Sequence, residues 1–320
     1  MDEKIVAAQK IAEKIADNVE KIIIGKEQAI ELAIIGLISK GHLLIEDAPG
    51  VGKTMLARSL AKAIDCTFKR IQFTPDMLPS DITGVAIYNQ KTSDFEFRAG
   101  PIMANIVLAD EINRATPKVQ SALLECMEEG RISIEGITHE LPSPFHILAT
   151  QNPIEYEGTF PLPETQLDRF LLRLNLGYPS LADEIAIMEN QQHSHPIEEL
   201  KPVATSDEVL NLQAMVKKIY VDDLVKKYIS SLVAATRQHA SVYLGASPRG
   251  SLALFRTGQA RALLAGRDFV LPDDIKALAE PVLAHRLIVR SKNHSREESA
   301  RAVISQLLET VLVPGTIATR

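Results

Sequence analysis

The hydrophobic positions fall into two patterns over the first half of the chain. Short apolar runs that end at a polar residue are typical of strands buried in a parallel sheet, whereas apolar residues spaced three or four apart are typical of helices. The runs predict strands over residues 42–46, 66–73, 105–110, 145–150 and 170–176. The helical spacing predicts helices over residues 28–39 and 55–64. Because strands and helices alternate, we expect an α/β fold with a three-layer core around a parallel sheet.

Three further segments differ from this alternation. Residues 4–19 place apolar side chains on one helical face and predict a helix before the first strand. Residues 84–101 alternate between apolar and polar positions around a polar turn, and so do residues 131–141. Alternation of this kind predicts two hairpins, and Glu135 with Gly136 would form the turn of the second one.

The second half of the chain has a different pattern. Strand signals end near Gly177, and helical spacing replaces them. The spacing predicts helices over residues 181–190, 206–219, 222–240, 250–265, 273–285 and 296–311. We therefore expect two domains, an α/β core over residues 1–177 and an all-helical domain over residues 178–320.

Composition and charge narrow the classes of function. The 320 residues are 46% hydrophobic and 24% charged with a formal net charge of −6, which is ordinary for a globular protein and unlike a basic nucleic-acid binder. The two cysteines lack C-x-x-C spacing, which favours a reducing compartment and no disulfide or metal framework. The charged N-terminus and the lack of any apolar run near ~18 residues predict neither a secretion signal nor a membrane span. We therefore expect a cytoplasmic protein.

The strongest chemical signal lies in the stretch "HLLIEDAPGVGKTMLARSL". A buried strand, a glycine-rich loop and a helix follow one another, which is the order of a phosphate-binding loop. Gly50 and Gly52 would let backbone N–H groups turn toward phosphate oxygens. Lys53 could then reach the β- and γ-phosphates, and the Thr54 hydroxyl could bind Mg²⁺. Asp47 stands where the usual pattern has its first glycine, and the Pro-Gly turn that follows can replace that glycine.

Polar residues also end two later strands. Asp110 and Glu111 follow one apolar run, and Asn152 follows another. One acidic residue at such a strand end can hold Mg²⁺, and its neighbour can polarise a water molecule aimed at the γ-phosphate. The Asn152 amide could hydrogen-bond that water or the phosphate. A solvated acidic pair and an Asn-Pro turn are common by themselves, but their order after the phosphate loop favours an ATPase site.

Longer motifs point to a family. The strings "FTPDMLPSDITGVAIYNQ", "LADEINRATPKVQSALLECMEEG" and "ILATQNPIEYEGTFPLPETQLDRFLL" closely resemble the MoxR family of AAA+ ATPases. The resemblance runs from about Val19 to the end of the chain and is densest between Ile71 and Leu172. It implies an AAA+ core followed by a helical lid domain. The two hairpins would be the inserts of this family that face a pore or a client protein.

The resemblance implies a role for each motif. Lys53 and Thr54 would be the Walker A pair, and Asp110 and Glu111 the Walker B pair. Thr54 and Asp110 would hold Mg²⁺, Glu111 would activate water, and Asn152 would be sensor 1. The ATP-binding residues would be Ile24 and Gly25 beside the adenine and Pro49, Gly50, Val51, Gly52, Lys53, Thr54 and Met55 around the phosphates.

Two arginines would complete the site. Arg169 resembles the arginine finger, which reaches the nucleotide of a neighbouring subunit and stabilises transition-state charge. Arg173 and Arg114 are rivals for this role, and Arg169 could instead pair with Asp168. Arg249 resembles sensor 2, and its plain alternative is a surface arginine at a helix start.

The resemblance also implies how the protein works. The family implies a homo-oligomeric ring, usually a hexamer, that remodels, activates or matures a client or adaptor protein, often one with a von Willebrand factor A domain. A subunit of a metal-chelatase-like motor, a nucleic-acid motor and a non-enzymatic nucleotide sensor are the alternatives. The hairpin tips "NQKTSD" and "EG" carry little positive charge, which disfavours the nucleic-acid motor. The complete set of catalytic residues disfavours the sensor. No motif names the client, the ring size or the remodelling step that ATP drives.

Overall fold

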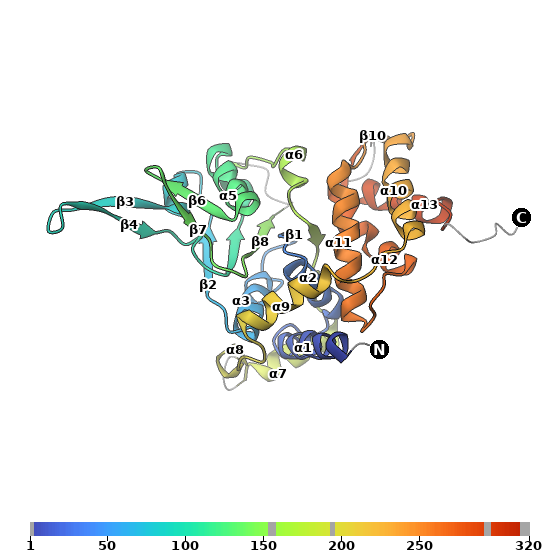
Figure 1. Cartoon of the computed structure of the whole chain (residues 1–320), viewed down its shortest axis with the longest axis horizontal. Coiled ribbons are helices and arrows are strands. Elements are labelled where there is room, and N and C mark those ends of the chain that lie inside the picture. Colours follow the sequence, from blue (N-terminus) through green and yellow to red (C-terminus); the bar gives the residue numbers. More distant parts are fainter. Residues whose placement is uncertain (1–2, 153–157, 193–195, 291–295, 314–320) are drawn as a thin grey trace, which may run out of the picture. The chain divides into compact units, whose positions relative to one another are not determined.

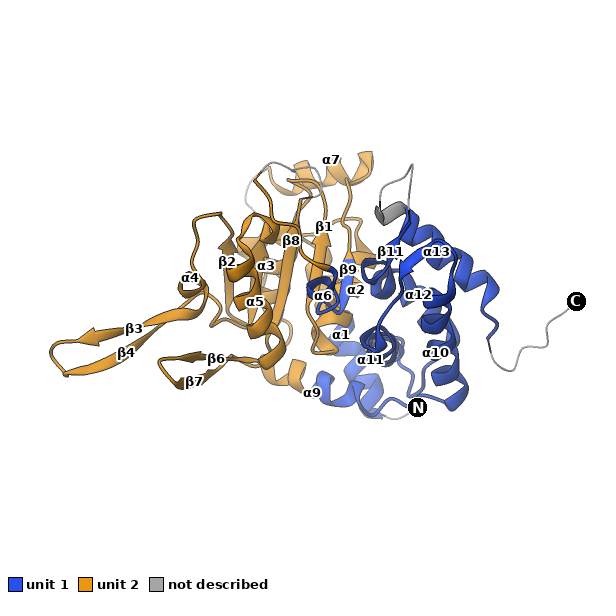
Figure 2. Ribbon diagram, turned by 90° about the horizontal axis from the view of Figure 1, so that it is seen from above, with its two compact units in different colours: residues 1–13, 164–173, 211–320 blue, residues 14–163, 174–210 orange. Residues whose placement is uncertain are grey.

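The computed structural model describes residues 3–152, 158–192, 196–290 and 296–313. The chain forms two compact units, which Figure 2 distinguishes by colour. Unit 1 comprises residues 1–13, 164–173 and 211–320, and unit 2 comprises residues 14–163 and 174–210. Each unit is therefore built from separate stretches of the chain, and the single domain division after residue 177 stays a prediction.

A five-stranded sheet forms the centre of the α/β core. Its strands are β1 Leu43–Glu46, β2 Phe68–Gln72, β5 Ile106–Asp110, β8 His146–Gln151 and β9 Leu172–Leu174. The strand order is β2-β5-β8-β1-β9, and the pairs β2–β5, β5–β8 and β8–β1 are parallel. All of β5 and all but the last residue of β8 are buried, as expected for strands covered on both faces. The predicted α/β fold with a parallel sheet is confirmed.

Helices follow the strands as the hydrophobic spacing predicts. The main helices of the first half are α1 Glu3–Glu20, α2 Glu27–Ile38, α3 Lys53–Ala63 and α5 Pro117–Glu129. The apolar face of α1 is buried through Ile5, Ala8, Ala12, Ile15 and Val19. Proline at the first position starts α5, and Gly130 with a φ of 64° ends it.

Both hairpins form where the alternating pattern placed them. The first pairs β3 Gly84–Asn89 with β4 Asp94–Ala99, and the second pairs β6 Arg131–Ile134 with β7 Ile137–Glu140. Figures 1 and 2 both show β3 and β4 projecting away from the sheet of unit 2. Glu135 and Gly136 have φ values of 49° and 79°, which is the left-handed pair that a tight two-residue turn needs.

Short helices connect these parts and complete unit 2. They are α4 Pro79–Thr83, the 3₁₀ turn η1 Ile112–Arg114, α7 Leu181–Asn190, α8 Pro196–Glu199 and the start of α9 Ser206–Val216. The hydrophobic pattern predicts α7 and α9, whereas α4, η1 and α8 are too short for a helical period to be visible.

Unit 1 is mainly helical. It contains α6 Glu164–Leu167, α10 Asp223–Gln238, α11 Pro248–Leu264, α12 Pro272–Leu283, the 3₁₀ turn η2 Ala284–Arg286 and α13 Arg296–Thr310. Two strands that the pattern did not predict, β10 Val242–Leu244 and β11 Ile288–Val289, pair antiparallel in this unit. Strands of three and two residues carry no readable alternation, which explains why the sequence alone suggested only helices after Gly177.

Candidate active site

The phosphate loop, residues 47–54, connects β1 to α3 in unit 2. Gly50 and Gly52 have φ values of 84° and 100°, in the left-handed region that favours glycine. A Cβ atom on Gly50 would meet no atom within 4 Å, so the backbone angle rather than space requires glycine there. Lys53 and Thr54 follow directly as the first residues of α3, whose positive N-terminal end suits an anion.

Lys53 lies among acidic groups. Its Nζ donates to the backbone carbonyl of Asp47 at 2.7 Å. Burial lowers the pKa of the Lys53 amine from its ordinary value, and the charges of Asp110, Asp47 and Glu111 act in the opposite direction. Because these charges act on Lys53, the loop lysine lies near the acidic end of β5.

Asp47 explains how the loop does without its first glycine. Its Oδ2 accepts hydrogen bonds from the backbone N–H groups of Leu176 at 2.6 Å and Gly177 at 2.7 Å, and its Oδ1 accepts from Ala48 at 3.0 Å. The side chain therefore anchors the segment after β9 to the phosphate loop. A glycine at this position would remove all three hydrogen bonds.

Asp110 ends β5 and is buried. Its Oδ1 accepts from the Thr150 hydroxyl at 2.6 Å, and its Oδ2 accepts from Arg70 Nε at 3.0 Å. Thr150 is fully buried on β8, whereas the Arg70 side chain on β2 is 48% exposed. The sequence predicts neither partner, because each lies on a different strand and becomes a neighbour only through the strand order.

Glu111 has a left-handed backbone with φ 58° and ψ 50°, a sparsely populated region for a residue with a side chain. Its N–H donates to the Thr150 hydroxyl at 2.8 Å, so the hydroxyl that binds Asp110 also fixes the Glu111 backbone. The Glu111 carboxylate accepts from Gln72 Nε2 at 2.8 Å and from Arg114 at 3.2 Å. Strained backbone of this kind is concentrated at functional sites.

Asn152 directly follows β8, which lies between the loop strand β1 and the acidic strand β5. The carboxyl ends of parallel strands meet at one edge of the sheet, so Asn152 shares that edge with Asp110 and the phosphate loop. Asn152 is buried, and its backbone carbonyl accepts from Asn113 Nδ2 at 3.5 Å. Residues 153–157 of the motif that follows lie outside the described residues.

The segment expected to border the adenine is a turn after α1. Ile24 lies in this turn, and Gly25 has a φ of 69°. A Cβ atom on Gly25 would lie 2.3 Å from Oδ2 of Asp183, so this position has room only for glycine. Ile23, one residue earlier, packs near the loop, because its Cδ1 lies 3.8 Å from a Cβ built on Gly52.

The candidate arginines belong to unit 1. Arg169 is exposed between α6 and β9, and Arg249 is exposed in the first turn of α11. Of the two rivals for the finger role, Arg173 is 9% exposed on β9, and Arg114 forms an ion pair with Glu111 of its own chain. Burial argues against Arg173, whereas Arg169 and Arg114 are both exposed, so the choice of Arg169 as the finger stays a prediction.

The donor set fits Mg²⁺ bound together with phosphates. Among the residues that the structure describes, no three His, Cys, Asp or Glu side chains gather into a metal cage. Mg²⁺ typically uses one or two protein oxygens and completes its shell with phosphate and water oxygens. The Thr54 hydroxyl and the Asp110 carboxylate are donors of that kind.

The strand order and the site residues define a class of protein. A phosphate loop after β1, an acidic pair after β5 and a polar amide after the intervening β8 are arranged as in an AAA+ ATPase. The family described as "ATPase family associated with various cellular activities (AAA)" matches residues 42–172, and the AAA lid domain matches residues 234–307. Within this class, the chain belongs to the MoxR family.

Proteins that align with nearly the whole chain support this assignment. The chaperone MoxR1 of Mycobacterium tuberculosis is 42% identical over 321 residues, which are 98% of this chain and 85% of that protein. The uncharacterised protein YeaC of Bacillus subtilis is 53% identical over 301 residues, 94% of each chain. A candidate ATPase from Cytophaga hutchinsonii, with a crystal structure at a TM-score of 0.89, is 39% identical and covers 98% of this chain and 97% of its own. In the part of the chain that the structure describes, no helix is long and apolar enough to cross a membrane.

Proposed function

We propose that the chain hydrolyses ATP to ADP and phosphate in a Mg²⁺-dependent reaction and uses the energy to remodel a partner protein. The observation that carries the proposal is the set of contacts around Glu111. Glu111 has a left-handed backbone whose N–H donates to Thr150, and its carboxylate accepts from Gln72 and Arg114, next to Asp110 and near Lys53. A carboxylate fixed in this way can accept a proton from water as the water attacks the γ-phosphate.

The other residues would bind and orient the nucleotide. The N–H groups of the phosphate loop and Lys53 would hold the phosphates, Ile24 and Gly25 would border the adenine, and Asn152 would orient the attacking water. Thr54 and Asp110 would hold Mg²⁺, which would neutralise part of the phosphate charge. Arg70 pairs with Asp110 from an exposed position, so this pair would leave Asp110 available to hold the metal.

The exposed arginines support an oligomer. Arg169 would act as the arginine finger on the nucleotide of a neighbouring subunit, and Arg249 would act as sensor 2. A site that is completed head-to-tail by its neighbour suits a closed ring, because a ring gives every subunit the same neighbour. We propose a homo-oligomeric ring, with six subunits as the expected number, in the cytoplasm. Sedimentation with ATP would measure the subunit number, and cell fractionation would test the location.

The first hairpin supports a protein partner rather than a nucleic acid. Val85, Ile87, Tyr88 and Phe95 are exposed apolar side chains on β3 and β4. Exposed apolar groups on a projecting element suit contact with protein, whereas nucleic acid requires a basic surface. We propose a client or adaptor with a von Willebrand factor A domain as this partner.

Substitution of Glu111 tests the proposed ATPase reaction. Glu111→Gln should keep ATP binding and lower kcat by about 100-fold or more, since it removes a general base. Glu125→Gln, which changes an exposed carboxylate on α5, is the matched control and should retain turnover. Unchanged turnover in Glu111→Gln would contradict the assignment of the catalytic base.

The same variant tests the partner. Glu111→Gln protein, held with ATP bound, should retain its client during purification, and mass spectrometry should identify a von Willebrand-type protein. The Lys53→Ala protein should lose that partner because it cannot hold the phosphates. Recovery of nucleic acid or of a chelatase-like complex would replace this part of the proposal and leave the ATPase reaction unaffected.

A further inference from the structure

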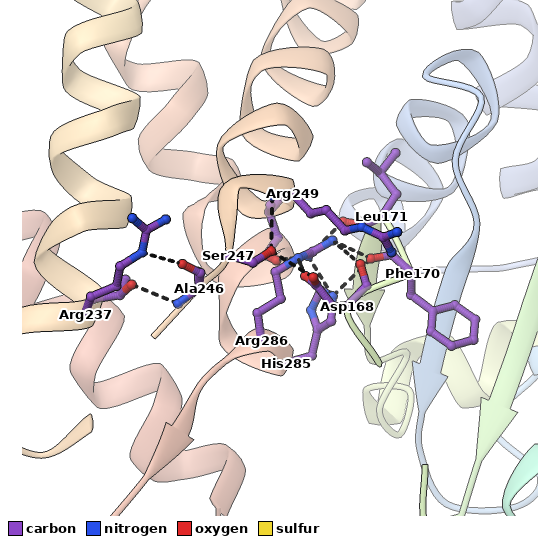
Figure 3. A network of polar contacts seen from close by, with 11 residues as sticks. Asp168, Phe170, Leu171, Arg237, Ala246, Ser247, Arg249, His285 and Arg286 are labelled. Carbon is purple, nitrogen blue, oxygen red and sulfur yellow. Dashed lines mark hydrogen bonds and ion pairs between the residues drawn. The ribbon is translucent and has the colours of Figure 1, made fainter. Parts of the chain in front are cut away.

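A buried ion pair lies in unit 1, next to the expected arginine finger. Arg286 Nε donates to Oδ1 of Asp168 at 2.9 Å, and the Arg286 side chain is only 3% exposed (Figure 3). The same guanidinium donates to the backbone carbonyls of Phe170 at 2.6 Å and Leu171 at 3.3 Å. Arg286 thus holds the backbone on the C-terminal side of Arg169 and the carboxylate on its N-terminal side.

The second oxygen of Asp168 reaches a different part of the same unit. Oδ2 accepts from the Ser247 hydroxyl at 2.8 Å (Figure 3). The Ser247 hydroxyl in turn accepts from the backbone N–H of Arg249 at 3.1 Å, and Ser247 is the N-cap of α11. Asp168, which directly precedes Arg169, is therefore connected through Ser247 to the first turn of α11, the helix that carries Arg249.

Further contacts hold Ser247 itself in place. The residue before it, Ala246, donates its N–H to the Thr236 hydroxyl at 3.0 Å, and its carbonyl accepts from Arg237 Nε at 2.8 Å. Thr236 is fully buried on α10. The residue before Ser247 is thus held through both its N–H and its carbonyl, so the bond to Asp168 joins residues 164–173 to a segment that is itself anchored on α10.

The charges around this ion pair are mostly positive. Burial lowers the pKa of the Arg286 guanidinium to about 10, Asp168 acts in the opposite direction, and the nearby charge of Arg249 lowers the pKa further. The pKa of His285 is also lowered, by burial first and then by the charges of Arg286 and Arg173. Asp168 is thus a carboxylate among several cations, and its removal would leave the buried Arg286 without its compensating charge.

We propose that Asp168 is a positioning residue that holds the two candidate catalytic arginines, Arg169 and Arg249, as one rigid piece. Ser247 and Arg286 are its two attachments. Motion of unit 1 would then carry both arginines together rather than one at a time. This inference rests on the proposed function, because it gives Arg169 and Arg249 the roles of finger and sensor 2.

Ser247→Gly is the mildest test. Glycine caps a helix almost as well as serine, so the change removes the bond to Asp168 with little effect on α11 itself. We expect kcat for ATP to fall about tenfold, because a hydrogen bond to a charged group is lost, while the KM and the affinity for ATP stay unchanged. Ser247→Thr should recover most of the activity. Asp222→Gly, which alters the N-cap of α10 far from Asp168 in sequence, should retain full turnover.

A double-mutant cycle separates positioning from general stability. In an Arg249→Ala background, Ser247→Gly should add little further loss of kcat, because the bond acts through the arginine that is already absent. A full additional loss in that background would overturn the positioning role. Thermal unfolding of each variant confirms that the protein remains folded during the comparison.

Hydrogen exchange tests the connection without any nucleotide. Asp168→Asn should raise amide exchange together in residues 164–173 and in the first turn of α11, because asparagine cannot accept both bonds as a carboxylate does. An increase confined to residues 164–173 would overturn the proposal. If Asp168→Asn does not fold, the exchange of Ser247→Gly protein in the same two segments decides the question.

Different variants test the roles of the two arginines and the positioning role of Asp168. If Arg169→Ala and Arg249→Ala retain full ATP turnover, the proposed roles of the arginines are wrong. If both variants lose turnover but Ser247→Gly has the kcat and the amide exchange of the original protein, only the positioning role of Asp168 is wrong.

Discussion

Two aspartates in different units have the same kinds of partner. Asp110 in unit 2 pairs with Arg70, and Asp168 in unit 1 pairs with Arg286. Each carboxylate also accepts a hydrogen bond from a hydroxyl, and each directly precedes a candidate catalytic residue. The two pairs differ in the burial of the arginine, because the side chain is 48% exposed for Arg70 and 3% exposed for Arg286.

This difference assigns different tasks to similar pairs. An exposed arginine costs little to displace, so Asp110 could release Arg70 if it holds Mg²⁺ as proposed. A buried arginine that also binds backbone carbonyls cannot leave without exposing several unpaired groups. The Asp110 pair is thus suited to a group that changes partner during turnover, and the Asp168 pair is suited to a fixed support.

The largest expected effect comes from deleting each arginine in turn. Arg286→Met should lower the free energy of unfolding by about 3–5 kcal/mol, because it leaves a partly buried carboxylate and backbone carbonyls without their donor. Arg70→Met should cost at most about 1 kcal/mol, since the guanidinium that it removes is half exposed to water and Asp110 keeps its hydrogen bond from Thr150. Chemical denaturation followed by circular dichroism measures both values. Equal losses for the two variants would remove the distinction between the pairs.

Acidification gives a second, smaller test through a buried histidine of unit 2. Burial lowers the pKa of His42 to about 4, and its ring bonds the carbonyl of Met127 and the N–H of Ile147 as the neutral form requires. The unfolded chain binds a proton near pH 6.5 and the folded chain does not, so stability is full above that pH and falls as the pH drops toward 4. The contribution lost by pH 4 is on the order of 3 kcal/mol.

Denaturation curves between pH 7 and pH 4 measure this loss, and His42→Gln should make the dependence shallower. His285 in unit 1 also has a pKa well below its ordinary value, so the slope should persist in part in that variant. A pH dependence that stays as steep in His42→Gln as in the original protein would assign the effect to other groups.

The smallest expected effect concerns the hydroxyl on the Asp110 side. Thr150→Val removes both the donor to Asp110 and the acceptor of the Glu111 N–H, at a cost of about 1–3 kcal/mol in stability. We expect a lower kcat as well, because both acidic residues lose a support. Thr150→Ser keeps the hydroxyl and is the control. Steady-state ATPase assays compare the two, and a Thr150→Val protein with unchanged kcat would show that the hydroxyl supports only the fold.

The sequence could predict the features that are encoded in contiguous residues, namely the main strands and helices and the motifs beside them. The strands β5 and β8 are buried because their runs are apolar, and α3 begins at Lys53, two residues before the predicted start at Met55. The phosphate loop, Asp110 and Asn152 are recognisable because each lies next to a strand that has its own pattern. Contiguous motifs of this kind need no knowledge of how the strands are ordered.

Contacts made across the fold were not predictable. Thr150 meets Asp110 because β5 and β8 are neighbours in register, and no spacing within either strand records that register. Ser247, Asp168 and Arg286 come from three distant stretches and meet only after folding. Short elements such as β10 and β11 escape detection because two or three residues cannot display a period.

Asp47 shows what a departure from a motif can mean. A comparison that scores residues against the glycine pattern counts this position as a flaw in the phosphate loop. Glycine would give the loop a more flexible backbone. The Asp47 carboxylate instead binds the loop to the N–H groups of Leu176 and Gly177. Restoring glycine in an engineered version would therefore bring the protein closer to the general motif. It would also remove the hydrogen bonds that hold the segment after β9 against the phosphate loop.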